Sequence, residues 1–195
     1  MIRIAAILLA AGASIRFGGA NKLLAVLDGR AVITHTAAAV AASRVREIVV
    51  VTAPDDAAVR AALAQLPCRF VTNPAPERGM GSSIASGVTA LDGSVGGAFV
   101  VPADMPYLET NLLDRLIDAF DAEHGRAAIY PVTPKGEQRN PVLWPAHLFA
   151  RLAALDGPHG AKAILLDPAL RTHALPWHNT RTFHDIDIPE DLDRA

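Results

Sequence analysis

The chain has 195 residues, of which 51% are hydrophobic and 19% are charged, and its formal net charge is −2. This composition predicts one compact globular domain over residues 1–195 and argues against disorder. Lysines and arginines are scattered, so we expect no nucleic-acid partner, and no apolar stretch approaches the roughly 18 residues of a membrane span. Cys68 is the single cysteine, which excludes an intrachain disulfide and suits a cytoplasmic location.

The first half of the chain alternates between predicted strands and helices. The apolar run Ile4–Ala11 has strand length, although Arg3 and the small residues after the run loosely resemble a short signal peptide. We favour the strand, because cleavage there would remove an element that the following segments need. A turn signal at Asp28-Gly29 comes next. The hydrophobic periodicity then predicts a helix over 32–43, a strand over 47–52, a helix from 54–56 to 66, a strand over 69–72, a helix over 79–91 and a strand over 97–101.

The second half has shorter predicted elements. They are a helix over 112–120 with Thr110 as its cap, strands over 127–132 and 141–144, helices over 146–155 and 161–166, an extended stretch over 171–175, a strand over 183–186 and a helix that begins at 189. Alternating strands and helices indicate right-handed βαβ units, and therefore a Rossmann-like, three-layer α/β fold with a mostly parallel sheet. The later elements are expected to form an insertion or a cap over the edge of the sheet.

The loop after the first strand carries the strongest local signal. It begins at Gly12 and delivers two cations, Arg16 and Lys22. Ser14 stands where the second glycine of G-x-G-x-x-G should be, and the Gly-Lys-Ser/Thr of a Walker A loop is missing. A longer loop around a triphosphate fits better, with Lys22 neutralising phosphate oxygens. The alternative is an ordinary strand-to-helix loop with surface cations.

Two acidic segments are candidates for metal binding. Asp104 follows a predicted buried strand, and ligands bind at the carboxyl edge of open α/β sheets. Its carboxylate suits Mg²⁺, which takes one or two carboxylates together with substrate phosphates. Asp185 or Asp187 could complete that site. The alternatives are a turn aspartate at 104 and a capping box formed by Asp187 with Glu190.

Two further segments are candidates for substrate binding. In Arg78-Gly79-Met80-Gly81-Ser82-Ser83, flexible backbone, free N–H groups and hydroxyls at a helix start suit a base, ribose or phosphate. The alternative is a tight turn with Ser82 or Ser83 as the N-cap. Arg139-Asn140-Pro141 offers a cation and an amide to a substrate, or is a simple turn. The seven histidines show no zinc spacing, and no G-x-S-x-G elbow occurs.

Together these motifs resemble the molybdenum cofactor nucleotidylyltransferases and their relatives. The resemblance rests on Leu8-Leu9-Ala10-Ala11-Gly12-x-Ser14-x-Arg16-Phe17-Gly18 with Asn21-Lys22, on Pro102-Ala103-Asp104-Met105-Pro106, and on Asp185-Ile186-Asp187-Ile188-Pro189-Glu190-Asp191. The pair Ala10-Ala11 before Gly12 is similar to the cytidylyltransferase branch, whereas the guanylyltransferase branch typically has Ala-Gly-Gly there.

The resemblance implies a fold of the nucleotide-diphospho-sugar transferase type and transfer of CMP from CTP to molybdopterin cofactor, with Mg²⁺ as cofactor and release of pyrophosphate. A molybdoenzyme that receives the product is a further implied partner. By similarity, Lys22, Asp104 and Arg16 are catalytic, and Asp104 and Asp187 hold the metal. The nucleotide-binding residues implied are Leu9, Ala10, Ala11, Gly12, Arg16, Lys22, Gly81, Ser82 and Ser83, and the acceptor-binding residues are Arg139, Asn140 and Pro141.

One departure weakens the prediction of the acceptor. The family usually has an acidic residue after Gly157, where this chain has Pro158, in a segment expected to lie near the acceptor. Three other hypotheses therefore stay open. They are a nucleotidylyltransferase with another nucleotide or an acceptor such as a sugar phosphate, an NAD(P)H-dependent oxidoreductase, and a non-catalytic molybdenum cofactor chaperone.

Overall fold

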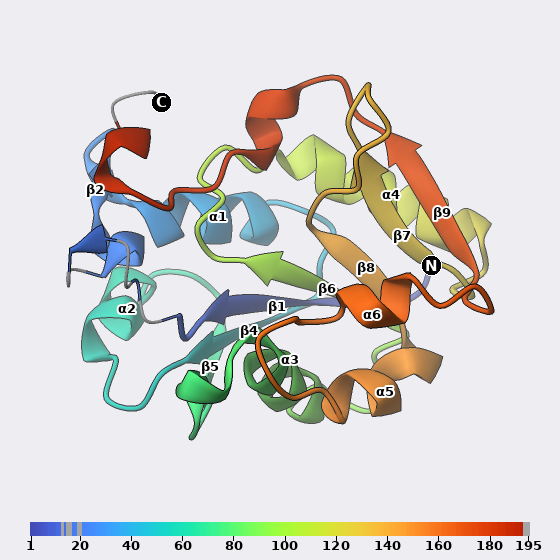
Figure 1. Cartoon of the computed structure of the whole chain (residues 1–195), viewed down its shortest axis with the longest axis horizontal. Coiled ribbons are helices and arrows are strands. Elements are labelled where there is room, and N and C mark those ends of the chain that lie inside the picture. The colour runs from blue at the N-terminus through green and yellow to red at the C-terminus, as the bar shows by residue number, and fades with distance from the viewer. Residues whose placement is uncertain (13, 15–16, 19–20, 193–195) are drawn as a thin grey trace.

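A seven-stranded sheet runs through the centre of the molecule, with helices on both of its faces (Figure 1). The computed structural model describes the chain apart from residues 13, 15–16, 19–20 and 193–195. The strand order is β5-β4-β1-β6-β8-β7-β9, and β8 alone runs antiparallel to its neighbours. The mostly parallel sheet is therefore confirmed. The strands are β1 (Ile4–Ala10), β4 (Glu47–Thr52), β5 (Arg69–Thr72), β6 (Gly97–Pro102), β7 (Ala128–Val132), β8 (Val142–Pro145) and β9 (Thr172–Pro176).

The central strands are buried on both faces, which is why their sequences are apolar without alternation. In β1, Ile4, Ala6 and Leu8 pack into the core on one face, and Ala5 and Ile7 pack into the core on the other. The first core lies under α1 (Val32–Ala41), α2 (Ala57–Ala62) and α4 (Thr110–Ala122). The second lies under α3 (Met80–Thr89), α5 (Phe149–Ala153) and α6 (Lys162–Leu165). These are the three layers that the alternating elements predict.

The start of α4 differs from the prediction. The helix begins at Thr110 itself, and Glu109 precedes it. The Thr110 hydroxyl donates a hydrogen bond to the carbonyl of Ala39, 3.0 Å away, so it ties α4 to α1 and does not cap its own helix.

The second half of the chain extends the sheet and does not form a separate cap. Strands β8, β7 and β9 join β6 at one side, and β9 becomes the edge. Short helical turns lie between the strands and beyond β9. They are η2 (Lys22–Leu24), η3 (Pro76–Arg78), η4 (Ala146–Leu148), η5 (Thr180–Phe183) and η6 (Pro189–Asp191). A small hairpin, formed by β2 (Val26–Leu27) and β3 (Arg30–Ala31), contains the predicted turn at Asp28-Gly29.

The strand predicted over 183–186 is wrong, and the helix predicted from 189 is a single 3₁₀ turn in the described residues. Described residues 183–186 form no strand, because both edges of the sheet lie elsewhere, at β5 and β9. This segment instead lies against the loop after β6, where the N–H of Ile186 donates to the carbonyl of Asp104 at 3.0 Å. The turn η6 follows it in the described part of the chain. The C-terminal segment therefore belongs to the surroundings of Asp104.

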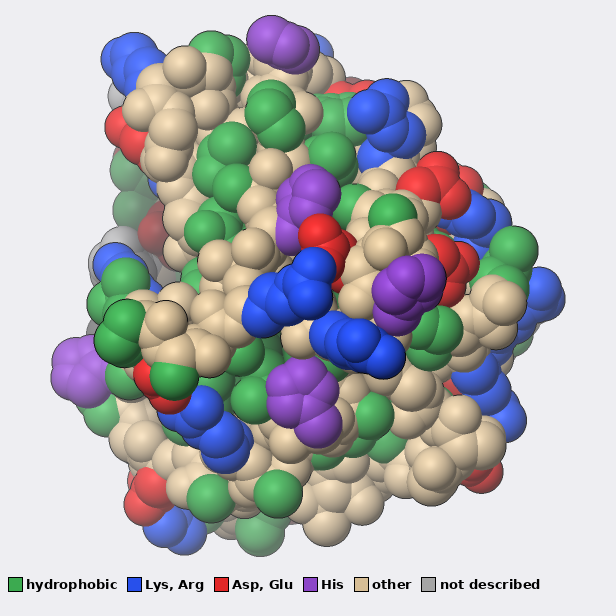
Figure 2. Space-filling model, turned by 90° about the vertical axis from the view of Figure 1, so that its right-hand side faces the viewer, with side chains coloured by type: hydrophobic (Ala, Val, Ile, Leu, Met, Phe, Trp, Pro, Cys, Tyr) green, Lys and Arg blue, Asp and Glu red, His purple; other side chains and the backbone are tan. Residues whose placement is uncertain are grey.

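Charged side chains mark the β9 edge of the sheet. Glu123, at the end of α4, pairs with Arg171 at 2.6 Å and with His173 of β9 at 3.1 Å. Figure 2, which views the molecule from this side, shows basic, acidic and histidine side chains interspersed. Charges on an edge strand disfavour pairing with another chain. No helix in the described part of the chain is long and apolar enough to cross a membrane.

Candidate active site

The loop that carries Asp104 is held from three sides at the carboxyl edge of the sheet. The N–H of Ala103 donates to the carbonyl of Leu9, 3.3 Å away at the end of β1. The hydroxyl of Thr36, fully buried in α1, donates to the carbonyl of Ala103 at 3.0 Å. With the bond from Ile186 to Asp104 described above, β1, α1 and the C-terminal segment all fix this loop. Ligands bind at this edge in open α/β sheets.

Lys22 enters the same site from the loop after β1. Lys22 is the first residue of η2, a turn that Asn21 caps by accepting a hydrogen bond from the N–H of Leu23 at 3.0 Å. The N–H of Lys22 donates to the Ser14 hydroxyl at 3.2 Å, which ties the turn back to the start of the loop. Arg16, the other cation predicted here, lies outside the described residues.

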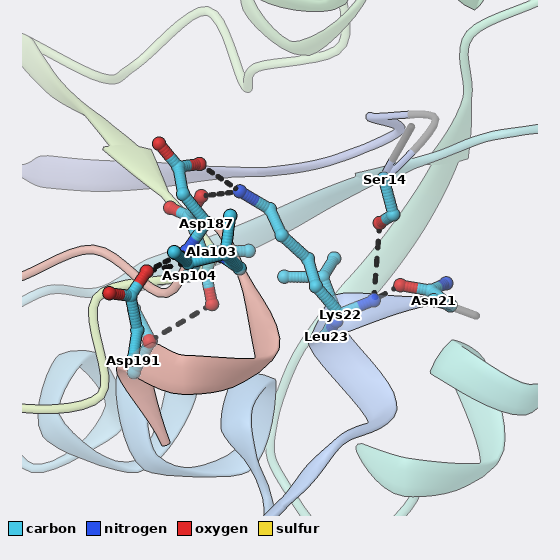
Figure 3. A network of polar contacts seen from close by, with 10 residues as sticks. Ser14, Asn21, Lys22, Leu23, Ala103, Asp104, Asp187 and Asp191 are labelled. Atoms are coloured by element: carbon cyan, nitrogen blue, oxygen red, sulfur yellow. Dashed lines mark hydrogen bonds and ion pairs between the residues drawn. The ribbon is translucent and has the colours of Figure 1, made fainter. Parts of the chain in front are cut away.

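The ammonium group of Lys22 lies between two carboxylates (Figure 3). Its Nζ is 2.5 Å from Asp104 Oδ2 and 2.9 Å from Asp187 Oδ1. Partial burial alone would lower the pKa of Lys22, but the attraction of Asp104 and Asp187 outweighs it and raises that pKa above its ordinary value. Lys22 is therefore charged at neutral pH. The structure thus brings together three of the residues predicted to be catalytic or metal-binding.

These carboxylates are suitable ligands for a magnesium ion that is bound together with a substrate. The second oxygen of Asp104, Oδ1, is buried and has no hydrogen-bond partner among the described residues. In the same part of the chain, no group of three or more His, Cys, Asp and Glu side chains is arranged to hold a metal alone. Two carboxylates with the remaining ligands from phosphate and water is the usual arrangement for Mg²⁺. The carboxylates of Asp104 and Asp187 are therefore chemically suited to hold Mg²⁺ together with a phosphate substrate.

Asp191 supports Asp187 from the following turn. Its carboxylate accepts hydrogen bonds from the N–H groups of Asp187 at 2.9 Å and Ile188 at 3.0 Å. A capping interaction thus exists here, but its acidic residue is Asp191, and the predicted pairing of Asp187 with Glu190 is wrong. The carboxylate of Asp187 is left to face Lys22.

A recess of about 360 Å³ opens beside this cluster. Some of the predicted nucleotide-binding residues line it and others do not. Those on its wall, together with Asp104, are Leu9, Ala11, Gly12, Lys22 and Ser83. Ala10 is buried within β1 and is not on the wall. Gly81 and Ser82 are not on it either, and Ser82 donates its hydroxyl to backbone carbonyls of its own loop.

Two glycines at the start of α3, Gly79 before the helix and Gly81 in its first turn, allow a close approach of a distant segment. A Cβ on Gly79 would lie 2.7 Å from the Cα of Pro158, and one on Gly81 would lie 2.8 Å from the carbonyl carbon of Asp156. The N–H of Gly81 donates to the carbonyl of Gly157 at 2.9 Å. Pro158 itself lines the recess. The residue that departs from the family pattern therefore lies on the wall of the first recess and not on that of the recess lined by Arg139 and Asn140.

A second recess, of about 220 Å³, lies next to the first, and Met80 lines both. Arg139, Asn140 and Asp185 line the second recess, as do three residues that sequence reasoning did not single out, Trp144, His159 and Lys162. Pro141, in a cis peptide bond with Asn140, is not on its wall.

Asp185 shows that this second recess is an unusual environment for an anion. Burial removes this carboxyl from water, and the negative charges of Asp104 and Asp187 also disfavour its ionised form. The pKa of Asp185 therefore rises to about 7. Lys22 and Arg139 oppose the shift without cancelling it. A carboxyl with this pKa carries only part of its charge at neutral pH, so it repels an incoming phosphate less than an ordinary aspartate would.

Residues 6–174 match the model of the MobA-like NTP transferase domain. The chain belongs to this family. A MobA-like NTP transferase uses the Rossmann-like fold found here, and a nucleotidyl transferase from Methanothermobacter superposes on 98% of the chain with a TM-score of 0.82, at 24% identity and over 95% of its own length. The match to this family supports a nucleotidyltransferase and argues against the hypothesis of an oxidoreductase.

Curated relatives of this MobA-like transferase differ in the nucleotide and the acceptor that their names state. A 2-C-methyl-D-erythritol 4-phosphate cytidylyltransferase from Streptomyces coelicolor is 35% identical over 81% of the chain. A probable molybdenum cofactor guanylyltransferase from Natronomonas pharaonis is 26% identical over 97% of the chain and 95% of its own length. The chain spans 64% of the Streptomyces protein and 28% of the bifunctional protein GlmU from Mycolicibacterium vanbaalenii, which is 35% identical over 66% of the chain.

Proposed function

We propose that this MobA-like NTP transferase transfers CMP from CTP to the terminal phosphate of molybdopterin cofactor, with Mg²⁺, and releases pyrophosphate. One observation carries the proposal. The cluster of Lys22, Asp104 and Asp187 lies where two recesses meet, since Asp104 lines the first and its neighbour Met105 lines the second. Two recesses with a shared charged boundary suit a reaction that joins two substrates.

The proposed reaction balances without a covalent intermediate. A phosphate oxygen of the acceptor attacks the α-phosphorus of CTP, a P–O bond forms, and the bond to pyrophosphate breaks. Both reactants are anions, so positioning and charge neutralisation supply most of the catalysis. Asp104 and Asp187 would hold Mg²⁺, which neutralises triphosphate charge when it is bound. Lys22 would then contact the phosphates in place of the two carboxylates.

Cytosine is the base that the sequence around the first recess favours. Ala10 and Ala11 precede Gly12, as in the cytidylyltransferase branch, and a relative 35% identical is named a cytidylyltransferase. The relative that matches the chain end to end is named a guanylyltransferase, so GTP is the alternative to test.

The second recess supports molybdopterin as the acceptor. Arg139 and Lys162 supply cations for a phosphate, and Trp144 and Met80 supply an apolar wall for a flat heterocycle. Gln138, Asn140 and His159 also line this recess and offer polar groups to hydroxyls, so a sugar or polyol phosphate is the alternative acceptor to test. The product would then pass to a molybdoenzyme in the cytoplasm.

Pyrophosphate release tests the proposal. Purified protein with Mg²⁺ is incubated with each NTP in turn, once with molybdopterin cofactor and once with 2-C-methyl-D-erythritol 4-phosphate. We expect pyrophosphate to be released only when both CTP and molybdopterin cofactor are present. Turnover with GTP would overturn the cytidine assignment, and turnover with the erythritol phosphate would overturn the acceptor. Binding of the cofactor without turnover of any NTP would indicate a chaperone.

A further inference from the structure

A buried asparagine lies directly behind the wall of the first recess. Asn73 follows β5, is 1% exposed, and makes polar contacts with both ends of its amide. Its Nδ2 donates to Ser82 Oγ at 2.9 Å and to Ser83 Oγ at 3.0 Å. Its Oδ1 accepts from the N–H of Ala75 at 3.0 Å. Neither the sequence motifs nor the proposed function gives this residue a role.

The backbone determines which way the amide faces. The N–H of Ala75 can only donate, so the oxygen of Asn73 must face it and the NH₂ group must face the two serines. Both serine oxygens are therefore acceptors toward Asn73, and each keeps one hydroxyl proton to give elsewhere. Ser82 gives its proton to the carbonyl of Gly79 or of Ala75, at 2.8 and 3.1 Å.

The Ser83 hydroxyl has no such acceptor among the described residues. It is 6% exposed, and it lines the first recess. A buried hydroxyl whose proton finds no partner loses the free energy of a hydrogen bond. That proton is therefore available to the recess, where water accepts it when the recess is empty and a bound molecule accepts it when one displaces the water.

We infer that Asn73 fixes the polarity of Ser83, so that Ser83 always donates to a hydrogen-bond acceptor of the bound nucleotide, a carbonyl oxygen or ring nitrogen of the base. This inference rests on the proposed function, because it requires that the first recess binds a nucleoside triphosphate. Cytosine offers two such acceptors on its pairing edge. Asn73 is a positioning residue here, and Ser83 is the residue that contacts the ligand.

Asn73→Asp tests the inference, because it replaces the donating NH₂ group by an acceptor of nearly the same shape. At pH 8 the new carboxylate accepts the Ser83 proton, and Ser83 then presents its oxygen to the nucleotide. We expect the Kd for CTP, measured by titration calorimetry, to rise about tenfold, as for loss of one buried hydrogen bond. The KM for CTP should rise equally, whereas kcat at saturating CTP should change less than about threefold.

A double-mutant cycle with Ser83→Ala separates this role from a structural one. Ser83→Ala should raise the Kd as Asn73→Asp does, and the double variant should be no worse than either single variant. Ser86→Ala is the matched control, because Ser86 is on the same helix but donates to the carbonyl of Ser82, away from the recess. Its Kd should stay at the wild-type value.

Three results would overturn the inference. One is a folded Asn73→Asp protein that binds CTP as the wild type does. Another is a double variant whose Kd for CTP rises by the product of the two single-variant factors, which would mean that Asn73 acts independently of Ser83. If Asn73→Asp does not fold, Asn73→Ala takes its place in the cycle, and the same multiplication would count against the inference. A wild-type protein that binds no NTP would instead remove the proposed function itself.

Discussion

The ion cluster at Lys22 holds one positive charge between two negative ones. Lys22 and Asp104 are largely buried, and Asp187 is about half exposed, so the contact to Asp104 is the less screened of the two. Breaking a buried pair by removing one charge leaves the other uncompensated, which costs more than the pair contributes. A substitution in this cluster therefore tests function without a loss of stability only if it keeps the shape of the side chain and leaves no buried charge without a partner.

Asp104→Asn should abolish nucleotidyl transfer without unfolding the protein. Asparagine keeps the shape of the side chain and an oxygen for Lys22, but it loses the charge that would hold Mg²⁺. We expect kcat/KM to fall by roughly a thousandfold, as for loss of a main electrostatic contact in a transition state. Pyrophosphate release measures it, and circular dichroism checks the fold. Activity near that of the wild type would exclude Asp104 from the mechanism.

Lys22→Met should change the order in which metal and nucleotide bind. In the wild type the ammonium group neutralises Asp104 and Asp187 in the absence of substrate. Methionine has a similar length and no charge, so the two carboxylates should attract a divalent ion directly. We expect Mn²⁺ affinity without nucleotide to rise roughly tenfold by electron paramagnetic resonance, and CTP affinity to fall. Unchanged Mn²⁺ affinity would mean that Lys22 does not compete with the metal.

Sequence motifs identified the charged residues of the site but not the residues that support them. Lys22 and Asp104 follow buried strands, so their positions at one edge of the sheet could be predicted, whereas Asp187 was predicted from the resemblance although the strand expected before it does not form. Trp144 and Asn73 gave no such signal, because neither stands in one of the motifs and their surroundings are visible only in the fold. A buried asparagine beside a helix start is a pattern that could be searched for in other sequences.

At the scale of elements, the packing of α3 onto the sheet depends on a glycine. A Cβ on Gly87 would lie 2.3 Å from Ile7 Cγ2 of β1 and 3.0 Å from Val51 Cγ2 of β4. Real contacts of that length do not occur, so the helix would have to move away from the strands. Because Met80 and Ser83 of α3 line the first recess, such a movement would also disturb that recess.

Gly87→Ala should therefore destabilise the protein, although alanine is the better helix former. We expect a loss of about 2 kcal/mol in the free energy of unfolding, as for overpacking of a well-packed core. Urea denaturation measures it. Gly93→Ala is the matched control, because a Cβ there meets no atom within 4 Å, and its stability should change by less than about 0.5 kcal/mol. Equal effects of the two substitutions would contradict the close packing of α3.

Two strands were predicted residue for residue although they differ in burial. Strand 47–52 matches the buried β4, and strand 69–72 matches β5, an edge strand whose ends are exposed, because short runs rich in β-branched and aromatic residues favour strands in either setting. Residues 183–186 were also predicted to form a strand, but they lie away from both edges of the sheet and pair with no described strand. Whether such a segment becomes a strand depends on the topology of the sheet, which local sequence does not contain.

At the scale of the whole molecule, the site exists only when the fold is complete. Lys22 is 82 residues from Asp104 and 165 residues from Asp187 along the chain, and these residues come from a loop after β1, a loop after β6 and the C-terminal segment. Closing such distances costs chain entropy that the core repays, so the unfolded chain has no comparable site. A ligand that bridges these segments binds the folded state alone.

CTP and Mg²⁺ together should therefore raise the melting temperature more than the sum of their separate effects. At about 100 times its Kd, a ligand that binds only the folded state adds about 2.7 kcal/mol, which corresponds to roughly 5–10 °C for a chain of this size. Calorimetric scans with CTP, Mg²⁺ and both measure the effect. In Asp104→Asn the excess should disappear, while a smaller shift with CTP alone persists, because the other residues on the wall of the first recess are unchanged. An equal excess in that variant would place the metal away from Asp104.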